Sequence, residues 1–222
     1  MADEDKVLNV SGVRAYYDRL GSWLDSQGFY ENPAMDDLLA HARFGEAQRV
    51  FEFGCGTGKL AERLLGAYLP PSATYLGCDV SPVMAGLASR RLQAYNGRAE
   101  VLRTDGEVAF PLPERSADRV VSTYVLDLLS EDDALAFFAE AHRVLVPGGM
   151  LCLASLANGV TPLSRAVSSL WSALFRLRPS LVGGCRPVLL DAYVDRIYWQ
   201  VAHRKTVTPY GVPSEVLILA AV

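Results

Sequence analysis

Several marks of secreted, membrane-embedded or repetitive proteins are missing from this 222-residue chain. Its longest apolar runs are far too short to cross a bilayer. The N-terminal stretch MADEDKVLNVSG is acidic and polar, and it has neither the basic nor the apolar region of a secretory signal. No internal repeat or low-complexity tract is visible. From these absences we expect a cytoplasmic protein.

Cysteine is scarce and is never closely paired. The four cysteines stand at positions 55, 78, 152 and 185, and none forms a CxxC pair. This excludes a zinc knuckle and a thioredoxin-type motif. Cys55, Cys78 and Cys152 lie in apolar or glycine-rich, strand-like contexts, so we expect them to be small buried residues. We therefore expect a reducing compartment and no metal.

An excess of positive charge is also missing, since the net charge is -4. Phosphate binding depends on clustered Lys and Arg, so we expect no nucleic-acid partner. Apolar material, in contrast, is plentiful: 50% of the residues are hydrophobic and the mean hydropathy is +0.15. This is ample for a sizeable core, and the length suits one domain.

The N-terminal part, to about residue 45, has the pattern of helices. Apolar residues recur at helical spacing at positions 13, 16, 17, 20 and 24. A second helix is predicted over 34–43. Pro33 would then stand in its first turn, where a proline loses no hydrogen bond.

From Arg49 onward, short strand-like runs alternate with helical runs. The expected strands cover 49–54, 74–80, 99–105, 118–126 and 149–155, and the expected helices cover 59–68, 82–95 and 132–145. Such alternation predicts a parallel sheet of βαβ units, with ligands outside the carboxyl ends of its strands. Two further runs, 201–210 and 214–222, are predicted to end the sheet as an antiparallel pair.

An unusual segment precedes that pair. Residues 141–190 contain no Asp or Glu but five arginines. Thr161 and Pro162 are suited to the cap and first turn of a helix. An apolar stripe follows, with Ser164, Ser168 and Ser172 beside it: Leu163, Val167, Leu170, Trp171, Leu174 and Leu177. The stripe fits a lid helix over an apolar acceptor pocket, and it equally fits core packing with arginine tips in solvent.

A glycine loop follows the first strand, in Glu52-Phe53-Gly54-Cys55-Gly56-Thr57-Gly58. Glycines let the backbone turn sharply and approach a ligand, and the helix that follows offers unpaired N–H groups. A phosphate-binding P-loop is excluded, because Leu60 replaces its Ser or Thr. The dinucleotide pattern G-x-G-x-x-G is weakened by Lys59 at the third glycine, so a nicotinamide-dependent oxidoreductase stays a minor alternative.

Two acids end the next two strands. A carboxylate at Asp79 is placed to accept both hydroxyls of a ribose, as in other doubly wound nucleotide sites. A carboxylate at Asp105 is placed to accept from an adenine amine. Either acid alone could be a helix cap, but the glycine loop and both acids in register favour an adenosyl cofactor.

Four stretches together resemble class I methyltransferases of the ubiquinone/menaquinone-biosynthesis (methyltransferase type 11) branch. They are EFGCGTG, GCDVSPVMAGLASRR, TDGEVAFPLPERSADRVVSTYVLDLL and EAHRVLVPGGMLCLAS, which fall within residues 48–156. The resemblance implies a seven-stranded sheet in the order 3-2-1-4-5-7-6, with its last strand antiparallel. It also implies that S-adenosylmethionine is the cofactor and S-adenosylhomocysteine the product.

The same resemblance assigns cofactor contacts. The methionine part is bracketed by Glu52, Gly54, Gly56 and Gly58, to which we add Cys55 and Thr57 of the same loop. The ribose is held by Asp79 and Val80, and the adenine is flanked by Asp105, Gly106 and Glu107. Tyr124 lies near the sulfonium, and Tyr17, or its neighbour Tyr16, resembles an N-terminal lid tyrosine.

The donor in such a reaction needs no acid, base or metal from the protein, and alignment alone is worth ~7–11 kcal/mol. A base is required only where the acceptor must lose a proton. The candidate catalytic residues are Tyr124 and Asp127, although Asp127 could also cap its loop and Tyr124 could merely pack. His142 ends a helix, where the dipole favours a structural role, and His41 and His203 are expected on the surface.

We therefore expect a methyltransferase for a small, lipophilic acceptor such as a quinone precursor, a phospholipid head group or a similar metabolite. Peripheral membrane contact is expected through residues 160–186. The alternatives are a small thiol or other simple nucleophile, and a non-catalytic cofactor-binding partner subunit. No DPPY- or NPPY-type motif follows the fourth strand, which disfavours methylation of nucleic-acid bases.

The expected architecture is one doubly wound α/β domain over residues 1–222, with a Rossmann-like methyltransferase fold. A helical N-terminal lid covers 1–45, and the cofactor-binding core covers 46–156. A helical acceptor lid is expected over 157–190. Residues 191–222 are expected to form a C-terminal helix and the antiparallel strand pair.

Overall fold

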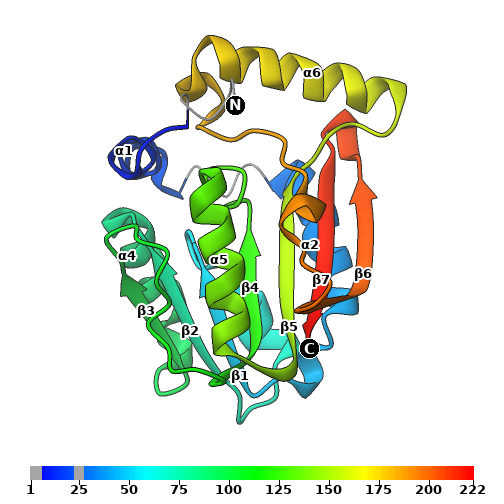
Figure 1. The fold of residues 1–222 in the computed structure, drawn as a ribbon. Coiled ribbons are helices and arrows are strands. Elements are labelled where there is room, and N and C mark those ends of the chain that lie inside the picture. The colour runs from blue at the N-terminus through cyan, green and yellow to red at the C-terminus, as the bar shows by residue number, and fades with distance from the viewer. Residues whose placement is uncertain (1–6, 23–27) are drawn as a thin grey trace.

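The computed structural model describes residues 7–22 and 28–222. In this part of the chain a central twisted sheet is covered by helices on both faces (Figure 1). The strands are β1 (Arg49–Phe53), β2 (Thr74–Asp79), β3 (Ala99–Arg103), β4 (Ala117–Thr123), β5 (Leu145–Leu156), β6 (Trp199–Val207) and β7 (Ser214–Ala221). They form one seven-stranded sheet in the order β3-β2-β1-β4-β5-β7-β6.

The direction of the strands confirms the predicted doubly wound fold. Strands β1 to β5 pair in parallel, whereas β7 runs antiparallel to both β5 and β6. The helices are α1 (Val10–Leu20), α2 (Gly28–His41), α3 (Lys59–Arg63), α4 (Pro82–Arg91), α5 (Glu131–Val144) and α6 (Pro162–Leu177). A π-helical turn, Leu64–Tyr68, extends α3, and a 3-10 turn, Leu92–Tyr95, extends α4.

Alternating residues of the strands pack into two apolar cores, one on each face of the sheet. On one face, Val121, Cys152 and Ile218 pack with α2 and α3. On the other, the neighbouring residues Val120 and Leu151 pack with α5. Side chains along a strand point to opposite faces, so near-continuous apolar runs are needed where both faces are covered. Cys55, Cys78 and Cys152 are buried, as expected.

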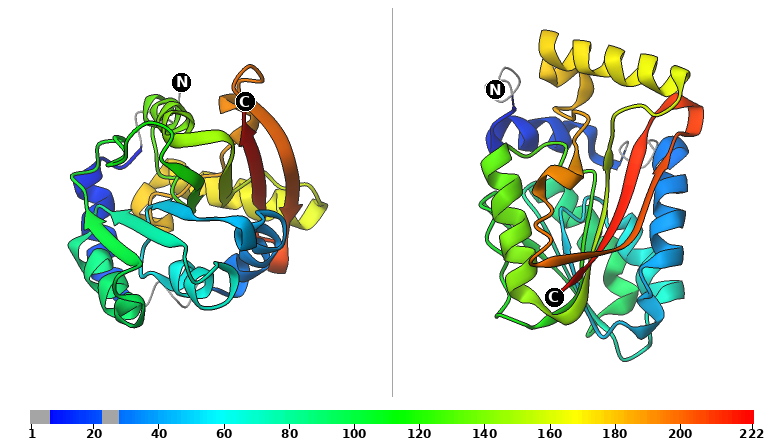
Figure 2. Two further views of the ribbon diagram at one scale, coloured as in Figure 1. Left: turned by 90° about the horizontal axis from the view of Figure 1, so that it is seen from below. Right: turned by 45° about the vertical axis from the view of Figure 1, so that its right-hand side comes forward.

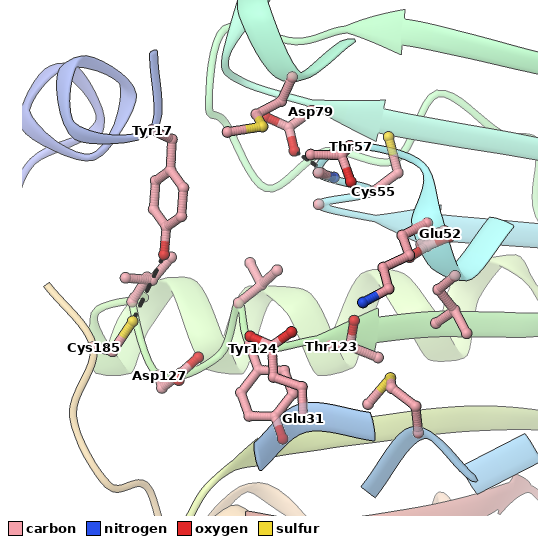
Figure 3. A pocket seen from close by; sticks show the side chains of 18 of the residues that line it. Tyr17, Glu31, Glu52, Cys55, Thr57, Asp79, Thr123, Tyr124, Asp127 and Cys185 are labelled. Carbon is pink, nitrogen blue, oxygen red and sulfur yellow. Dashed lines mark hydrogen bonds between the residues drawn. The ribbon is translucent and has the colours of Figure 1, made fainter. Parts of the chain in front are cut away.

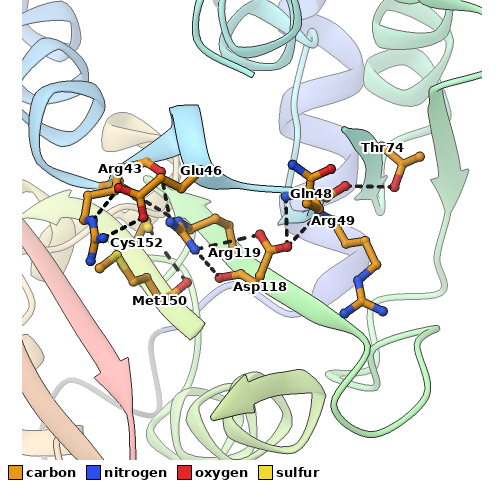
Figure 4. Close-up of polar contacts among 10 residues, drawn as sticks. Arg43, Glu46, Gln48, Arg49, Thr74, Asp118, Arg119, Met150 and Cys152 are labelled. Atoms are coloured by element: carbon orange, nitrogen blue, oxygen red, sulfur yellow. Dashed lines mark hydrogen bonds and ion pairs between the residues drawn. The ribbon is translucent and has the colours of Figure 1, made fainter. Parts of the chain in front are cut away.

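A polar cluster fixes the edge of the sheet where β1 and β4 begin (Figure 4). The buried Arg119 guanidinium donates to the carbonyls of Ala42 and Arg43, at 2.8 and 2.9 Å, just beyond the end of α2. The Asp118 carboxylate accepts the amides of Gln48 and Arg49, both at 2.9 Å. The bonds of Arg119 tie the chain just after α2 to the sheet, and those of Asp118 fix the start of β1.

The opposite edge, where the parallel strands end, carries the loops that follow β1, β2 and β4. Helices α1 and α6 lie above this edge, and α6 crosses the top of the molecule (Figures 1 and 2). Capping determines where α6 begins: the Thr161 hydroxyl accepts from the Ser164 amide, and the Ser164 hydroxyl accepts from the Thr161 amide. None of the described helices has the length and apolar character that a bilayer span requires.

Two predictions about helices were wrong. Helix α2 begins at Gly28, so Pro33 lies inside it and not in its first turn. The helix has an additional turn before residue 34, and Tyr30 in that turn packs edge-to-face on Tyr124 at 5.9 Å. This tertiary contact favours the earlier start. The C-terminal helix expected after residue 191 is only a 3-10 turn, Leu190–Tyr193. The predicted position Leu24 lies outside the described residues.

Candidate cofactor and acceptor site

The loop after β1 has a shape that only glycine tolerates. Gly54, Gly56 and Gly58 all have positive φ, at 76°, 53° and 76°. A Cβ on Gly54 would lie 2.4 Å from a methyl of Val125, and one on Gly58 would lie 3.0 Å from the backbone of Ala88. The loop therefore packs tightly against its neighbours, and its backbone stands open towards the cavity.

Asp79, at the end of β2, holds this loop in place (Figure 3). One carboxylate oxygen accepts the Gly56 amide at 2.9 Å, and the other accepts the Ser81 amide at 2.8 Å. Burial raises the pKa of this carboxyl, while the two amides act in the opposite direction. Each oxygen keeps a further acceptor site, so Asp79 can still receive the hydroxyls of a ribose.

Glu52 lies beneath the loop and is 1% exposed. The Tyr75 hydroxyl donates to its carboxylate at 2.7 Å. Burial raises the pKa of Glu52 to about 8, and the hydrogen bond from Tyr75 offsets only part of this effect. The hydrogen bond from Tyr75 thus holds Glu52 in place in the wall of the cavity.

A cavity of about 170 Å³ opens beside the loop. It brings together nine of the residues predicted from sequence, which are Tyr17, Glu52, Gly54, Cys55, Gly56, Thr57, Asp79, Tyr124 and Asp127. They come from α1, from β1 and its loop, from the end of β2 and from the loop after β4. The strand ends thus form one site, as the parallel-sheet pattern predicts.

Five other predicted residues do not line the cavity: Gly58, Val80, Asp105, Gly106 and Glu107. Gly58 instead packs against α4, as its contact with Ala88 shows. Asp105 and Glu107 are exposed. A Cβ on Gly106 would lie 2.3 Å from a methyl of Val10, so α1 packs directly over this stretch. The ribose contact of Val80 and the adenine contacts of residues 105–107 therefore stay a prediction.

Tyr124 leaves β4 in a conformation that is unusual for a tyrosine, with φ at +56°. Its hydroxyl donates to the Ser214 hydroxyl at 2.9 Å, and its amide donates to Ala154 at 2.7 Å. Burial raises the pKa of the phenol, so it stays neutral. A strained residue held from both sides is typical of a functional site.

Asp127 is fully buried in the loop after β4, and it faces the cavity. Among the described residues, neither of its carboxylate oxygens has a hydrogen-bond partner. Burial raises the pKa of Asp127 to about 7, against smaller opposing effects of nearby backbone amides and of the Arg186 charge. Arg186 donates to the backbone carbonyl of Asp127, at 3.1 Å from its amide, and not to the carboxylate. Asp127 is therefore a buried acid that the protein leaves unpaired.

The cavity closes where α1 meets the loop after α6. The hydroxyl of Tyr17 and the thiol of Cys185 lie 3.7 Å apart (Figure 3). The indole N–H of Trp171 in α6 donates to the Cys185 carbonyl at 3.0 Å. Burial raises the pKa of both the phenol and the thiol, so both groups stay protonated. Within the segment 157–190, Cys185 is the residue that reaches the cavity.

Sequence reasoning missed several lining residues, among them Tyr30, Glu31 and Cys185. Tyr30 and Glu31 belong to the early turn of α2, and Cys185 lies in an irregular loop. None of these positions carries a spacing that could have revealed it. Their place depends on how the N-terminal helices and the loop after α6 fold over the strand ends.

The three histidines lie away from the cavity lining. His142 packs its ring on Tyr198 and Trp199, at 5.0 and 5.4 Å. His41 and His203 stack at 3.7 Å, and His203 is bonded to Asp37 at 2.7 Å. His41 is exposed as expected, whereas His203 is half-buried, because the buried Asp37 draws its ring inward.

The chain matches the family model of the methyltransferase domain over residues 50–149. These residues contain β1 except Arg49, β2 to β4, the glycine loop, Asp79 and Asp127. The chain carries a class I methyltransferase domain that uses S-adenosylmethionine. The glycine loop and the free acceptor positions of Asp79 suit this cofactor, whose adenosyl and methionine parts need a close backbone and a ribose-binding acid.

Two curated methyltransferases are similar over most of the chain. The malonyl-[acyl-carrier protein] O-methyltransferase of Hahella chejuensis is 28% identical over 96% of this chain and 77% of its own length. The ubiquinone/menaquinone biosynthesis C-methyltransferase of Coxiella burnetii is also 28% identical, over 80% of this chain and 69% of its own length. Equal identity to both supports the methyltransferase class but does not single out the ubiquinone branch.

Other matches support the same class and fold. The chain spans only 50% to 58% of the length of three further curated methyltransferases. A solved S-adenosylmethionine-dependent methyltransferase from Aquifex aeolicus superimposes with a TM-score of 0.62 at 18% identity, covering 97% of this chain and all of that one. This likeness shows that the methyltransferase domain has the usual fold of such enzymes.

Proposed function

We propose that this methyltransferase acts on a small, lipophilic acceptor whose reacting atom carries a proton. The observation that carries the proposal is Asp127, a buried carboxyl without a hydrogen-bond partner that faces the cavity. An unpartnered buried acid is costly, and its most economical explanation is a ligand that supplies the missing donor. An O–H, N–H or S–H group of the acceptor is such a donor.

The walls around Asp127 indicate the rest of the acceptor. Three tyrosine rings, Tyr17, Tyr30 and Tyr124, line the cavity together with apolar side chains that include Val125 and Leu156. These surfaces favour an aromatic or aliphatic body over a strongly hydrated one. A quinone precursor, the head-group region of a phospholipid, or a similar metabolite fits this description.

In this proposal the residues divide the chemical work. When bound, S-adenosylmethionine supplies a methyl group that its sulfonium already activates. The glycine loop and Asp79 hold the donor, while Tyr124, fixed through Ser214, orients the acceptor. As the new bond forms, the acceptor proton passes to Asp127, which later returns it to water. A pKa of about 7 keeps a large share of Asp127 ionised at neutral pH, as this role requires.

The segment 157–190 takes part as a lid through Cys185, which faces Tyr17 across the cavity mouth. Lipophilic acceptors reside in membranes, so the proposal extends to peripheral membrane contact through residues 160–186. A second candidate function, methylation of a small thiol, is favoured by the same observation, since Asp127 could equally accept the proton of an S–H group.

The first experiment compares acceptors. Purified protein is incubated with methyl-labelled S-adenosylmethionine and, separately, with a lipid extract, a phenol and hydroquinone panel, and a small-thiol panel. Transfer to lipid or phenol supports the proposal, and transfer to thiols alone supports the second candidate. The same assays use Asp127→Asn and, as a matched control, Asp132→Asn on the exposed start of α5.

Each result has a defined meaning. Activity that falls with Asp127→Asn and not with Asp132→Asn supports Asp127 as the proton acceptor. Cofactor binding without transfer to any panel would favour a non-catalytic binding subunit. Full activity of Asp127→Asn would contradict the proposed role of this carboxyl.

A further inference from the structure

Helix α6 presents leucines to solvent and serines to the protein. Leu163, Leu170 and Leu177 are 63%, 63% and 78% exposed. They stand seven residues apart, which is close to two helical turns, so they form one stripe along the helix. We call these three residues the outer face of α6. An outward row of leucines over the whole helix is unusual for a surface that meets only water.

The orientation of α6 is fixed by polar contacts on its inner side. Ser164 and Ser168 are buried, and the Ser168 hydroxyl accepts the Gly159 amide at 3.1 Å. Trp171 is bonded to the Cys185 carbonyl, and Phe175 is buried. Turning the leucines inward would break these bonds. The outer face is therefore a constant feature of the fold.

Further apolar residues extend this surface. Val160 and Leu181, just before and after the helix, are 55% and 56% exposed. Tyr210, in the 3-10 turn Pro209–Gly211, is 79% exposed. This turn packs against α6, because a Cβ on Gly211 would lie 3.0 Å from Leu163. The apolar area is thus wider than one helix.

The segment that carries the outer face has charge of one sign. No Asp or Glu occurs between residues 141 and 190. Arg165, Arg176 and Arg178 are exposed on α6 and at its end. At 100° per residue, Arg165 and Arg176 lie about a third to half a turn around the helix from the leucines. Both arginines lie on the same side of the leucine stripe, so α6 carries an exposed apolar stripe with positive charge along one side, as helices that lie in a membrane interface do.

We infer that the outer face of α6 rests on the surface of an anionic phospholipid bilayer. Leucines would enter the interface while the arginines meet lipid phosphates. A second copy of this chain is a poorer partner, because it would bring two acid-free, arginine-bearing segments together. The inference extends the proposed function, since α6 also holds Cys185 at the cavity mouth, where a lipophilic acceptor would enter.

The test measures binding and does not depend on turnover. The full chain is sedimented with vesicles of phosphatidylcholine alone and with vesicles of phosphatidylcholine and phosphatidylglycerol in equal parts. We expect binding to the mixed vesicles that weakens with added salt, and little binding to phosphatidylcholine alone. Each change of Leu163, Leu170 or Leu177 to Ser is expected to weaken binding roughly tenfold. Arg165→Glu with Arg178→Glu is expected to remove the preference for the anionic lipid.

The matched control is Leu135→Ser, which removes a leucine that is 50% exposed on α5. We expect it to bind vesicles like the unchanged protein. Calorimetry with S-adenosylmethionine shows whether each variant is folded.

Absence of binding to the mixed vesicles, or equal binding by the triple serine variant, would overturn the inference. So would a dimer that the serine changes dissociate, without vesicle binding. A protein that binds vesicles but transfers no methyl group would leave the inference standing and contradict only the proposed function.

Discussion

Asp79, at the end of β2, and Asp127, in the loop after β4, have different hydrogen-bond surroundings. Both carboxylate oxygens of Asp79 accept hydrogen bonds from backbone amides, and this fixes the glycine loop. Asp127 is more deeply buried, yet within the described structure neither of its oxygens is hydrogen-bonded. Both face one cavity. In the proposed function, the first acid shapes the half of the site that would hold the cofactor, which we call the cofactor half, and the second is left available for a ligand in the half that would hold the acceptor, which we call the acceptor half.

The difference teaches how to separate a structural acid from a reactive one. Burial raises the pKa of both carboxyls. At Asp79 the amides of Ser81 and Gly56 oppose this rise, and at Asp127 the pKa reaches about 7 against smaller effects of nearby backbone amides and of the Arg186 charge. Burying the carboxyl of Asp127 without a hydrogen-bond partner destabilises the fold, and such destabilising groups are typical of functional sites. Four substitutions or titrations would break or sharpen this contrast.

The largest expected effect comes from Asp127→Asn. The amide keeps the shape of the side chain but cannot accept a proton, so we expect the turnover rate to fall by about 10²- to 10⁴-fold. Affinity for S-adenosylmethionine should stay nearly unchanged, because Asp127 lies in the acceptor half. Single-turnover methyl transfer and calorimetry measure the two quantities. If Asp127→Asn lowered cofactor affinity and left the turnover rate unchanged, the proposed difference between Asp127 and Asp79 would be wrong.

Asp79→Ala should show the opposite pattern. It removes two hydrogen bonds to a charged acceptor, each worth roughly 1.5–3 kcal/mol, and also the proposed ribose contact. We expect affinity for S-adenosylmethionine to fall by about 100-fold or more. Calorimetric titration measures this loss. Unchanged affinity would show that the loop keeps its shape without Asp79.

The pH dependence of rate and of stability should run in opposite directions. Protonated Asp127 cannot act as a base, so the rate should fall about tenfold per pH unit below a pKa near 7. Its folded pKa is raised above the usual 3.8, so its favourable contribution to stability is present at low pH and is lost as the pH rises towards 7. Asp127→Asn should therefore be more stable than the unchanged protein at pH 8 and equally stable near pH 4. Urea unfolding at both pH values tests this sign.

Gly54→Ala tests the glycine loop in the cofactor half, and we expect it to have the smallest effect of the four. The new Cβ would lie 2.4 Å from Val125 at a positive φ, so both crowding and backbone strain oppose it. Gly97→Ala is the matched control, since Gly97 also has positive φ but nothing lies within 4 Å of its Cβ position. We expect Gly54→Ala to cost about 1–3 kcal/mol more than the control in urea unfolding. Equal costs would show that the loop yields to the added methyl group.

Much of the cofactor half was predictable from sequence. The run from Glu52 to Gly58 and the acid at Asp79 are local signals, because a tight turn requires glycine and a strand end exposes its last side chain. The helices nearest the sheet also followed their periodicity. Pro33 misled the prediction of α2, because Tyr30 has a distant partner in Tyr124 that favours an earlier helix start.

The acceptor half was much less predictable. Asp127 could be named from its place after the fourth strand, but its burial and lack of a partner could not. Cys185 lies 58 residues further along the chain and meets Tyr17 only in the folded protein. The apolar stripe of α6 was visible, yet two orientations were open, as a lid lining or as core packing. The structure turns Ser164 and Ser168 inward and leaves Leu163, Leu170 and Leu177 in solvent.

By itself, the sequence determined the order of strands and helices, the two-faced core and the glycine loop. These depend on periodicity and on backbone conformations that few residues tolerate, and both are local properties. Only the tertiary structure decided which acid is paired, which residues close the cavity and which face of α6 meets solvent. Those outcomes depend on contacts between segments far apart in the chain, where a serine hydroxyl or a backbone amide at the right place outweighs the apolar pattern.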